Sequence, residues 1–324
     1  MHAERRKKAL NLPESLTYTV ASDAPIDGKE PVGDVVQKLP LSTWCAGFHS
    51  GGGHAPTITN VSKPGSDAEV LLVIPTLGQR LGFLRETLLS IRAQSVLVDI
   101  VVVAPTQASR VRDLAKEFRA DVIDDPGGLP EAINLGVSKG LVRHDFVNWL
   151  NDDDVLEPGS LKSTIDALHS DTSAVVAFGA CRYIDSHGLE LLTSRAGRWA
   201  PRILAWGPDL IPQPGMLVRS WAWKEVGGLD PSYRLAFDLD LLLKLKKKGS
   251  FINTGQVVSS FRWHPDSLTV DDRTRNIAES ERAKRAALGP IARRLAWVWE
   301  GPVRMATRIA AREVNRRAMK ASTR

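Results

Sequence analysis

The sequence predicts an α/β protein built on a doubly wound sheet. Three observations support this prediction: continuous apolar runs recur between residues 70 and 150, segments with helical spacing separate them, and a run of carboxylates follows the last one. Strands buried on both faces alternate with helices in this way when helices cover both sides of a parallel sheet. Ligands bind beyond the carboxyl ends of such strands, so the carboxylates mark the first candidate site.

Alternating strand and helix patterns make up residues 69–158. The run Val70–Ile74 is entirely apolar and ends at a proline, as expected for a strand buried on both faces. Leu84, Leu88 and Ile91 then recur at the spacing of one helix face. The predicted strands are residues 70–74, 100–103, 122–123 and 146–150, and the predicted helices are residues 81–93, 109–119 and 129–139.

The alternation weakens over residues 159–272, where shorter patterns carry the predictions. A strand at residues 174–178 is followed by a second segment, 181–184, which we expect to extend it as a hairpin. The leucine-rich segment Phe237–Lys248 predicts a helix. The other predictions here are helices at residues 159–169 and 220–226 and a strand at residues 257–262.

The two ends of the chain differ in composition from this central part. Residues 1–68 combine a basic cluster at positions 5–8 with scattered Pro, Gly and Ser, so we expect an irregular extension, with a weak strand pattern at residues 17–20. Residues 273–324 carry 14 basic and 4 acidic side chains, a local net charge of +10 in a chain whose total is +6. The body is therefore mildly acidic and the tail is basic.

The basic tail is expected to be helical from Ile277 onward, with breaks at Pro290 and Pro302. Its apolar residues follow three-to-four spacing, and tryptophans lie among its arginines. Such a helix is typical of a membrane-surface element and equally of a solvated helix packed on the preceding domain, so both interpretations stay open. No aromatic and basic binding motif accompanies the charge, which argues against nucleic acid as a partner.

Length and composition limit the class of protein. The chain has 324 residues, 43% of them hydrophobic and 25% charged, which is ordinary for a globular protein with a sizeable core. No apolar run reaches the roughly 18 residues of a membrane span, and the charged N-terminus lacks the apolar segment of a secretory signal. Cys45 and Cys181 fit no metal-ligand spacing and indicate a reducing compartment. We therefore expect a cytoplasmic protein, either free or peripheral on the inner face of the plasma membrane.

Asp152, Asp153 and Asp154 directly follow the fourth predicted strand. Adjacent carboxylates repel one another unless a cation joins them. A hard divalent ion is the natural candidate, because Mg²⁺-like ions take one or two carboxylates together with substrate phosphates. A solvated acidic turn is the alternative, and the motifs elsewhere in the chain favour the metal.

A series of short motifs occurs in a fixed order along the chain. Pro75-Thr76 ends the first strand, and the Asn-Asp-Asp-Asp turn at residues 151–154 ends the fourth. Gln213-Pro214, Val-Gly-Gly-Leu-Asp at 226–230, Asp-Leu-Asp at 238–240 and His-Pro-Asp-Ser-Leu-Thr at 264–269 follow. In these motifs and their order, residues 70–270 resemble the family 2 glycosyltransferases.

The resemblance implies a GT-A fold, a doubly wound mixed sheet with a Rossmann-like nucleotide-sugar-binding half at residues 69–158 and an acceptor-binding half at residues 159–272. It implies an inverting enzyme that moves a sugar of the hexosyl or deoxyhexosyl type from a nucleotide-diphosphate sugar to an acceptor hydroxyl, with Mn²⁺ or Mg²⁺ as cofactor. The acceptor would be a glycan or glycolipid. If the basic tail lies on a membrane, a cell-envelope or lipid-linked glycan is expected.

The same resemblance assigns roles to individual residues. Asp238 matches the catalytic base, which takes the proton of the acceptor hydroxyl. Asp153 matches a metal ligand, and His264 lies in the segment that reaches the metal or the diphosphate in relatives. Acceptor contacts are expected from Gln213 and Asp240. Contacts with the donor are expected from Pro75, Thr76, Asp124, Asp125, Asn134 and Asp152.

Two departures from the family pattern leave questions open. Asn151 stands where most relatives carry the first Asp of the motif, so the metal would be held more weakly or through water. The second strand runs into Val103–Gln107 without the acid that contacts the nucleotide base in many relatives, so UDP, dTDP and GDP donors all remain possible.

Several alternatives stay open beside these assignments. Asp238 could cap its helix instead of acting as a base. Arg262 could pair with phosphate or point outward from its strand. Trp206, Trp221 and Trp223 are expected in the core, with one of them a candidate platform under a sugar ring.

Two rival functions also stay open. A sugar-nucleotidyltransferase would carry a glycine-rich basic loop after the first strand, where residues 77–80 hold one glycine. A degenerate domain would bind the donor without turnover, and Asn151 gives that idea some support.

Overall fold

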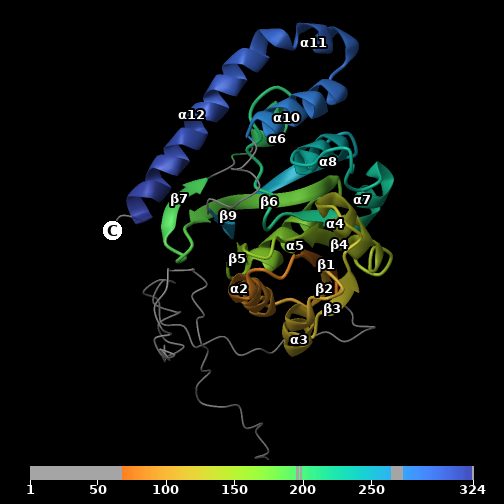
Figure 1. Ribbon diagram of the computed structural model, residues 1–324. Coiled ribbons are helices and arrows are strands. Elements are labelled where there is room, and N and C mark those ends of the chain that lie inside the picture. The colour runs from red at the N-terminus through yellow and green to blue at the C-terminus, as the bar shows by residue number, and fades with distance from the viewer. Residues whose placement is uncertain (1–67, 195–196, 198, 264–272, 323–324) are drawn as a thin grey trace, which may run out of the picture. The chain divides into compact units, whose positions relative to one another are not determined.

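The computed structural model describes residues 68–194, 197, 199–263 and 273–322. The described strands form one mixed sheet, with helices packed around it (Figure 1). The strands are β1 (Val70–Pro75), β2 (Val98–Ala104), β3 (Asp121–Asp124), β4 (Phe146–Trp149), β5 (Val155–Leu156), β6 (Ala174–Ile184), β7 (Glu190–Ser194), β8 (Leu217–Arg219) and β9 (Ser250–Arg262). They lie in the order β3-β2-β1-β4-β8-β6-β9-β5, and β7 pairs with β6.

The helices predicted between residues 81 and 248 are all present, with ends that differ from the prediction by a few residues. Two proline-containing helices, α6 and α11, were not predicted as separate elements. The helices are α2 (Leu81–Arg92), α3 (Ser109–Glu117), α4 (Leu129–Ser138), α5 (Ser160–Ser170), α6 (Ala200–Ile203), α7 (Ser220–Val226), α8 (Phe237–Leu245), α10 (Arg273–Ala287), α11 (Pro290–Leu295) and α12 (Trp297–Ser322).

The first half of the sheet is parallel, which confirms the Rossmann-like prediction. β1 lies between β2 and β4, and Val70 is in register with Val98 on one side and with Phe146 on the other. β3 continues the parallel order beyond β2. Because β1 and β4 run in the same direction, the residues that follow them meet at one edge of the sheet.

Both faces of this parallel half are buried, as the continuous apolar runs predict. Leu72 and Ile74 of β1 pack in the cluster that includes α2, α3 and α5, whereas Leu71 and Val73 pack in the cluster that includes α4, α7 and α8. α4 approaches β1 so closely that a Cβ on Gly136 would lie 2.4 Å from a methyl group of Val73. This position therefore requires glycine.

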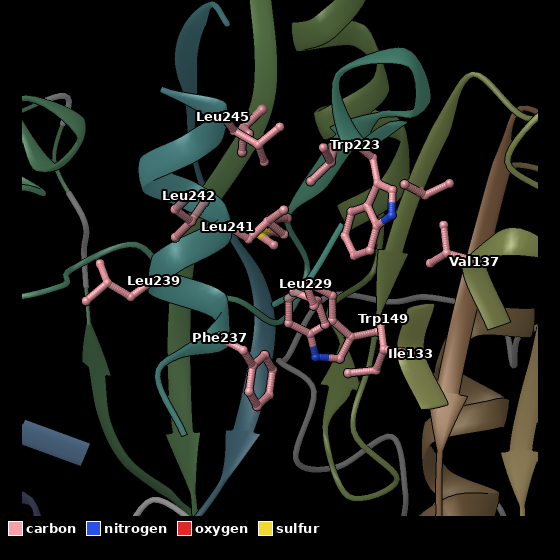
Figure 2. Close-up of a cluster of buried hydrophobic side chains, with 14 of the residues drawn as sticks. Ile133, Val137, Trp149, Trp223, Leu229, Phe237, Leu239, Leu241, Leu242 and Leu245 are labelled. Carbon is pink, nitrogen blue, oxygen red and sulfur yellow. The ribbon is translucent and has the colours of Figure 1, made fainter. Parts of the chain in front are cut away.

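A second feature of the core positions the start of α8. Phe237, the first residue of α8, packs against Trp149 at the end of β4, with ring centroids 6.0 Å apart. Figure 2 shows these two rings within the cluster that also contains Ile133 and Val137 of α4. The contact links the end of β4 directly to the residue that precedes Asp238.

The second half of the sheet is mixed, and here several predictions were wrong or incomplete. Residues 174–184 form one continuous strand, β6, and its hairpin partner is β7. β9 begins at Ser250, earlier than predicted, because residues 250–253 pair in parallel with β6. The short strands β5 and β8 were not predicted. β8 is antiparallel to both β4 and β6, so three residues join the two halves of the sheet.

The C-terminal helices pack partly on this sheet domain. Ala283 of α10 belongs to the same buried cluster as α8, so α10 is a structural part of the domain. Pro290 begins α11, but Pro302 lies inside α12 and does not break it, contrary to the prediction. No helix among the described residues is long and apolar enough to cross a membrane.

Some predictions fall outside the described residues. They are the basic cluster at 5–8, the strand pattern at 17–20 and the segment 264–272, which includes His264.

Candidate active site

A cavity of about 1010 Å³ opens at the carboxyl ends of β1 and β4. Its lining comes from the ends of both strands, the loop before β8, the first turn of α8, and helices α10 and α12. It brings together seven residues that the sequence analysis had assigned to one site across some 160 positions of the chain, namely Pro75, Thr76, Asp125, Asp152, Asp153, Gln213 and Asp238.

The turn after β4 carries two neighbouring carboxylates that face the cavity. The Thr76 hydroxyl donates to Asp152 Oδ2 at 2.5 Å, which ties the end of β1 to this turn. The Arg80 guanidinium lies 3.6 Å from an Asp152 oxygen and 3.2 Å from an Asp153 oxygen. Arg80 follows β1 in the loop before α2, and the sequence analysis did not identify it as a site residue. It compensates the charge of both carboxylates.

The third carboxylate, Asp154, has a structural role. It is completely buried, and it accepts hydrogen bonds from the Asn151 amide at 3.0 Å and from the Arg262 backbone N–H at 3.1 Å. Burial, followed by the charge of Asp153, raises the pKa of Asp154 well above its ordinary value. Asn151 therefore uses its amide N–H₂ within the turn.

Arg262 is buried beneath the same turn, so the alternative in which it points outward from its strand is wrong. Its side chain is buried rather than outward-pointing, and it donates to the Asp153 carbonyl at 3.0 Å and to Glu86 at 2.5 Å. The guanidinium also lies 4.3 Å from the centre of the Phe83 ring. Arg262 thus binds the backbone of the acidic turn and fixes it from below.

The pair Asp152–Asp153 fits a hard divalent cation on the chemistry of its donors. A guanidinium already lies against both carboxylates, so the position accepts positive charge. Ions of the Mg²⁺ type need only one or two carboxylates when substrate phosphates supply further oxygens. Among the described residues, no group of three His, Cys, Asp or Glu side chains forms an all-protein metal site. His264 lies outside the described residues, so its predicted role is untested.

Asp238 lies in the first turn of α8, where Ala236 occupies the N-cap position. Its carboxylate accepts the Leu239 backbone N–H at 2.8 Å, and Asp238 lines the cavity. Burial raises its pKa to about 6. Asp238 is therefore not the N-cap, and its carboxylate can exchange a proton near neutral pH.

Asp209 is a second carboxylate of this wall, and the sequence offered no pattern that identifies it. It follows Pro208 in the loop before β8 and lines the cavity. Asp209 keeps solvent contact through the cleft, yet the surrounding protein displaces much of the bulk water. This desolvation, followed by the charge of Asp238, raises the pKa of Asp209 to about 7. The charge of Asp238 therefore affects the pKa of Asp209.

Three predicted residues do not line the cavity. Asp240 is buried and lies 2.6 Å from Lys244 Nζ. The Asn134 amide donates to the Leu229 carbonyl at 2.8 Å and accepts its N–H at 3.0 Å, which ties α4 to the loop before α8. Asp124 pairs with Arg112. No contact supports a ligand-binding role for these three, whereas the predicted residue Asp125 does line the cavity.

Gln213 and two tryptophans also line the cavity. Gln213 donates to the Trp149 carbonyl at 2.7 Å, so its side chain anchors the loop before β8 to β4. Trp206 and Trp299 line the cavity with ring centroids 4.7 Å apart. Trp223 is buried as predicted, whereas Trp206 and Trp221 are partly exposed, which leaves Trp206 as the aromatic surface available to a ligand.

Glu279 of α10 fixes the loop that leads into α8. One of its oxygens accepts the backbone N–H groups of Arg234, Leu235 and Ala236 at 2.9, 2.8 and 3.2 Å. Burial opposes the charged form, but these bonds and Arg275 outweigh it and lower the pKa of Glu279. No pattern in the sequence predicts this contact, because its partners are backbone groups some 44 positions away.

Comparison with known proteins shows which proteins this chain is similar to. Residues 71–212 match the family model described as glycosyl transferase family 2. No curated protein sequence matches the chain. The fold is similar to the crystal structure of S. aureus TarS 1–349, with 14% identity and a TM-score of 0.51 over 68% of this chain and 65% of that one. The same TarS fragment in complex with UDP gives 14% identity and a TM-score of 0.50 with the same coverage. The chain thus spans slightly less than two thirds of these relatives.

Proposed function

We propose that the protein transfers a sugar from a nucleoside-diphosphate sugar to an acceptor hydroxyl with inversion at the anomeric carbon, in line with the match of residues 71–212 to glycosyl transferase family 2. One observation carries this proposal. The carboxylates after β4 and the Asp238 carboxylate at the start of α8 line a single cavity. Inverting transfer needs both a site for the leaving diphosphate and a base for the incoming alcohol.

The donor side of the site is assigned to the ends of β1 and β4. Thr76 and Asp152 form one hydrogen-bonded unit there, and Asp125 lines the same wall after β3. The TarS fragment was crystallised with UDP, which makes UDP-sugars the first donors to test. No acidic residue of the segment 105–108, which follows β2, lines the cavity. The preferred nucleotide base is therefore measured with a panel of nucleotides.

Asp153 and Asp152 would hold Mn²⁺ or Mg²⁺ together with the donor phosphates. When bound, the ion would neutralise the charge that develops on the departing diphosphate. Arg80 contacts the same two carboxylates, so its guanidinium would have to share them with the ion or turn toward the phosphates. Thr76 keeps Asp152 oriented throughout.

Asp238 is assigned as the base that accepts the proton of the acceptor hydroxyl. With a pKa of about 6 it is largely ionised at neutral pH, yet it is more basic than an ordinary Asp. The Phe237–Trp149 contact fixes the preceding residue in the core, so the carboxylate is held on a rigid element. Trp206 offers an apolar face on which the ring of the acceptor can stack.

The C-terminal helices are assigned to an anionic membrane surface, such as the cytoplasmic face of the plasma membrane, with a lipid-linked or cell-envelope glycan as acceptor. Met305 and Ile309 of α12 and Ile291 of α11 are 66%, 55% and 79% exposed. Basic residues surround them, and each basic side chain near an anionic leaflet contributes about 1 kcal/mol. Vesicles of phosphatidylglycerol should therefore co-sediment with the protein, and the double substitution Met305→Ser/Ile309→Ser should weaken this binding.

A matched control exists for the membrane experiment. Val142 of the sheet domain is 91% exposed, so Val142→Ser removes an apolar group that is at least as exposed as Met305 and Ile309. Co-sedimentation that is equal for both variants would reject the membrane assignment. This comparison is preferable to deleting residues 277–324, because the deletion would remove Glu279 and Ala283 from the domain.

The transferase proposal is tested by incubating the protein with Mn²⁺ or Mg²⁺ and a panel of nucleoside-diphosphate sugars. Release of a nucleoside diphosphate, by transfer or by slow hydrolysis, is the expected result. Release of pyrophosphate from a nucleoside triphosphate would instead identify a nucleotidyltransferase. Donor binding without release of any product, across a broad set of acceptors, would identify a domain that has lost turnover.

A further inference from the structure

Three arginines of α12 lie at four-residue intervals along one side of the helix. Arg304, Arg308 and Arg312 all line the cavity, and successive members are about 6 Å apart along the helix axis. In Figure 1, α12 extends from α11 toward β7 and lies apart from β1, β2 and β3. α12 therefore approaches the cavity on the side of β7.

Arg80 pairs with Asp152 and Asp153, and Arg304 lies 2.6 Å from a Glu281 oxygen. Within the described part of the chain, no carboxylate lies at ion-pair distance from Arg308 or Arg312, and both side chains are exposed. Both arginines line the cavity, and among the described side chains no carboxylate compensates their charge.

This arrangement has a chemical consequence. Like charges four residues apart on a helix destabilise it slightly, so their pairing gives no benefit to the free protein. Guanidinium groups bind phosphate oxygens through paired N–H donors, and a cleft raises the local potential that attracts an anion. Trp299 of the same helix contacts Trp206, and both rings line the cavity, which adds an apolar surface for a ring or polyol chain.

We propose that the acceptor is a phosphate ester, whose phosphate binds Arg308 and Arg312 at the cleft rim while one of its hydroxyl groups reaches Asp238. This assignment rests on the proposed transferase function and adds the chemical class of its acceptor. The donor diphosphate is assigned to Asp152 and Asp153 after β4, so UDP binding distinguishes a role on the donor from a role on the acceptor. The phosphate can belong to a soluble ester or to a lipid headgroup, because both present the same oxygens.

The test compares Arg308→Gln/Arg312→Gln with Arg294→Gln. Arg294 is an exposed arginine of α11 that does not line the cavity, so it controls for the loss of positive charge from the tail. The probes are glycerol 3-phosphate, uncharged glycerol and phosphatidylglycerol vesicles, and binding is followed by tryptophan fluorescence and by co-sedimentation. UDP binding is measured in parallel on every variant.

We expect the double variant to lose at least tenfold in affinity for glycerol 3-phosphate, for the vesicles, or for both, while Arg294→Gln stays within twofold. Loss with the soluble ester identifies a soluble acceptor, and loss with vesicles alone identifies a lipid headgroup. Arg308→Lys/Arg312→Lys should give an intermediate loss, since lysine keeps the charge without the paired donors.

Two results would overturn the assignment. Both probes could bind the double variant as tightly as the wild type, or UDP affinity could fall in parallel, which would place the arginines on the donor. Failure of the transferase proposal is distinguishable, because it would appear as wild-type protein that neither binds UDP nor releases it from any donor.

Discussion

Two groups of neighbouring carboxylates line the same cavity, but their surroundings differ. After β4, Asp152 and Asp153 face the guanidinium of Arg80, and Arg262 binds the backbone beneath them. Asp238 at the start of α8 and Asp209 in the loop before β8 lie close enough for the charge of Asp238 to act on Asp209, and their pKa values rise to about 6 and about 7. The first group is arranged around a cation, and the second is suited to exchange protons.

The difference shows how one residue type serves two kinds of chemistry. A compensated carboxylate has little tendency to take up a proton near neutral pH, so it suits the binding of positive charge. A partly desolvated carboxylate without a cationic partner has a raised pKa, so it suits proton transfer. The following predictions test this division, from the largest expected effect to the smallest.

The largest effect is expected from Asp238→Asn. Loss of the base should reduce the rate of transfer by about 10³-fold, whereas UDP affinity should change less than twofold, because the donor is assigned to the other group. Initial rates and UDP titrations measure the two quantities. Asp240→Asn is the matched control, since Asp240 pairs with Lys244 and does not line the cavity. An equal loss of donor affinity and rate would remove Asp238 from the role of base.

Removal of the metal tests the role of Asp152 and Asp153 after β4. Chelation by EDTA should lower transfer by about 10²-fold or more, and Mn²⁺ should restore it. Arg80→Gln should also raise the affinity for Mn²⁺ in the absence of nucleotide, because it frees both carboxylates; calorimetric titration of the metal measures this. If transfer persists in EDTA and is lost in Arg80→Gln, then the guanidinium itself is the cation of the site.

Glu279→Gln tests how firmly α8 is positioned. Weakening three hydrogen bonds from backbone N–H groups to a charged oxygen should lower the free energy of unfolding by about 2 kcal/mol in urea denaturation. Because the folded pKa of Glu279 is lowered, its contribution is present above the ordinary pKa of 4.5 and is lost as the pH falls below it. The difference between wild type and variant should therefore shrink at acidic pH. A difference independent of pH would show that the charge is unimportant.

The smallest effect is the pH dependence of transfer. The value of kcat/KM should rise tenfold per pH unit below about 6 and level off above it, because Asp238 must be ionised to accept a proton. In Asp209→Asn the rising limb should stay near pH 6, since Asp209 titrates above Asp238 and is mostly neutral there. If the rising limb of kcat/KM moves by one pH unit or more in Asp209→Asn, then the proton of the acceptor is taken up by the two carboxylates together or by Asp209.

The parallel half of the fold could be predicted from the sequence because each of its strands carries its own signal. Val70–Pro75 and Val98–Ala104 are apolar throughout, and helical spacing separates them. β8 has only three residues and β5 only two, so neither contains enough residues to show a period. Their pairing depends on partners far away in the chain. Pro302 likewise misled the prediction, because a proline limits a helix locally and cannot report the contacts that stabilise α12.

The sequence by itself determined the parallel sheet and several of the residues that approach the site, because continuous apolar runs and short ordered motifs indicate them. Only the tertiary structure decided which of these side chains share a cavity. It brought Arg80, Asp209 and the arginines of α12 to the cavity, placed Glu279 against the loop before α8, and directed Asp154, Asn134 and Asp240 to contacts within the protein. The physical reason is that burial and charge compensation depend on neighbours in space, and a linear sequence does not contain those distances.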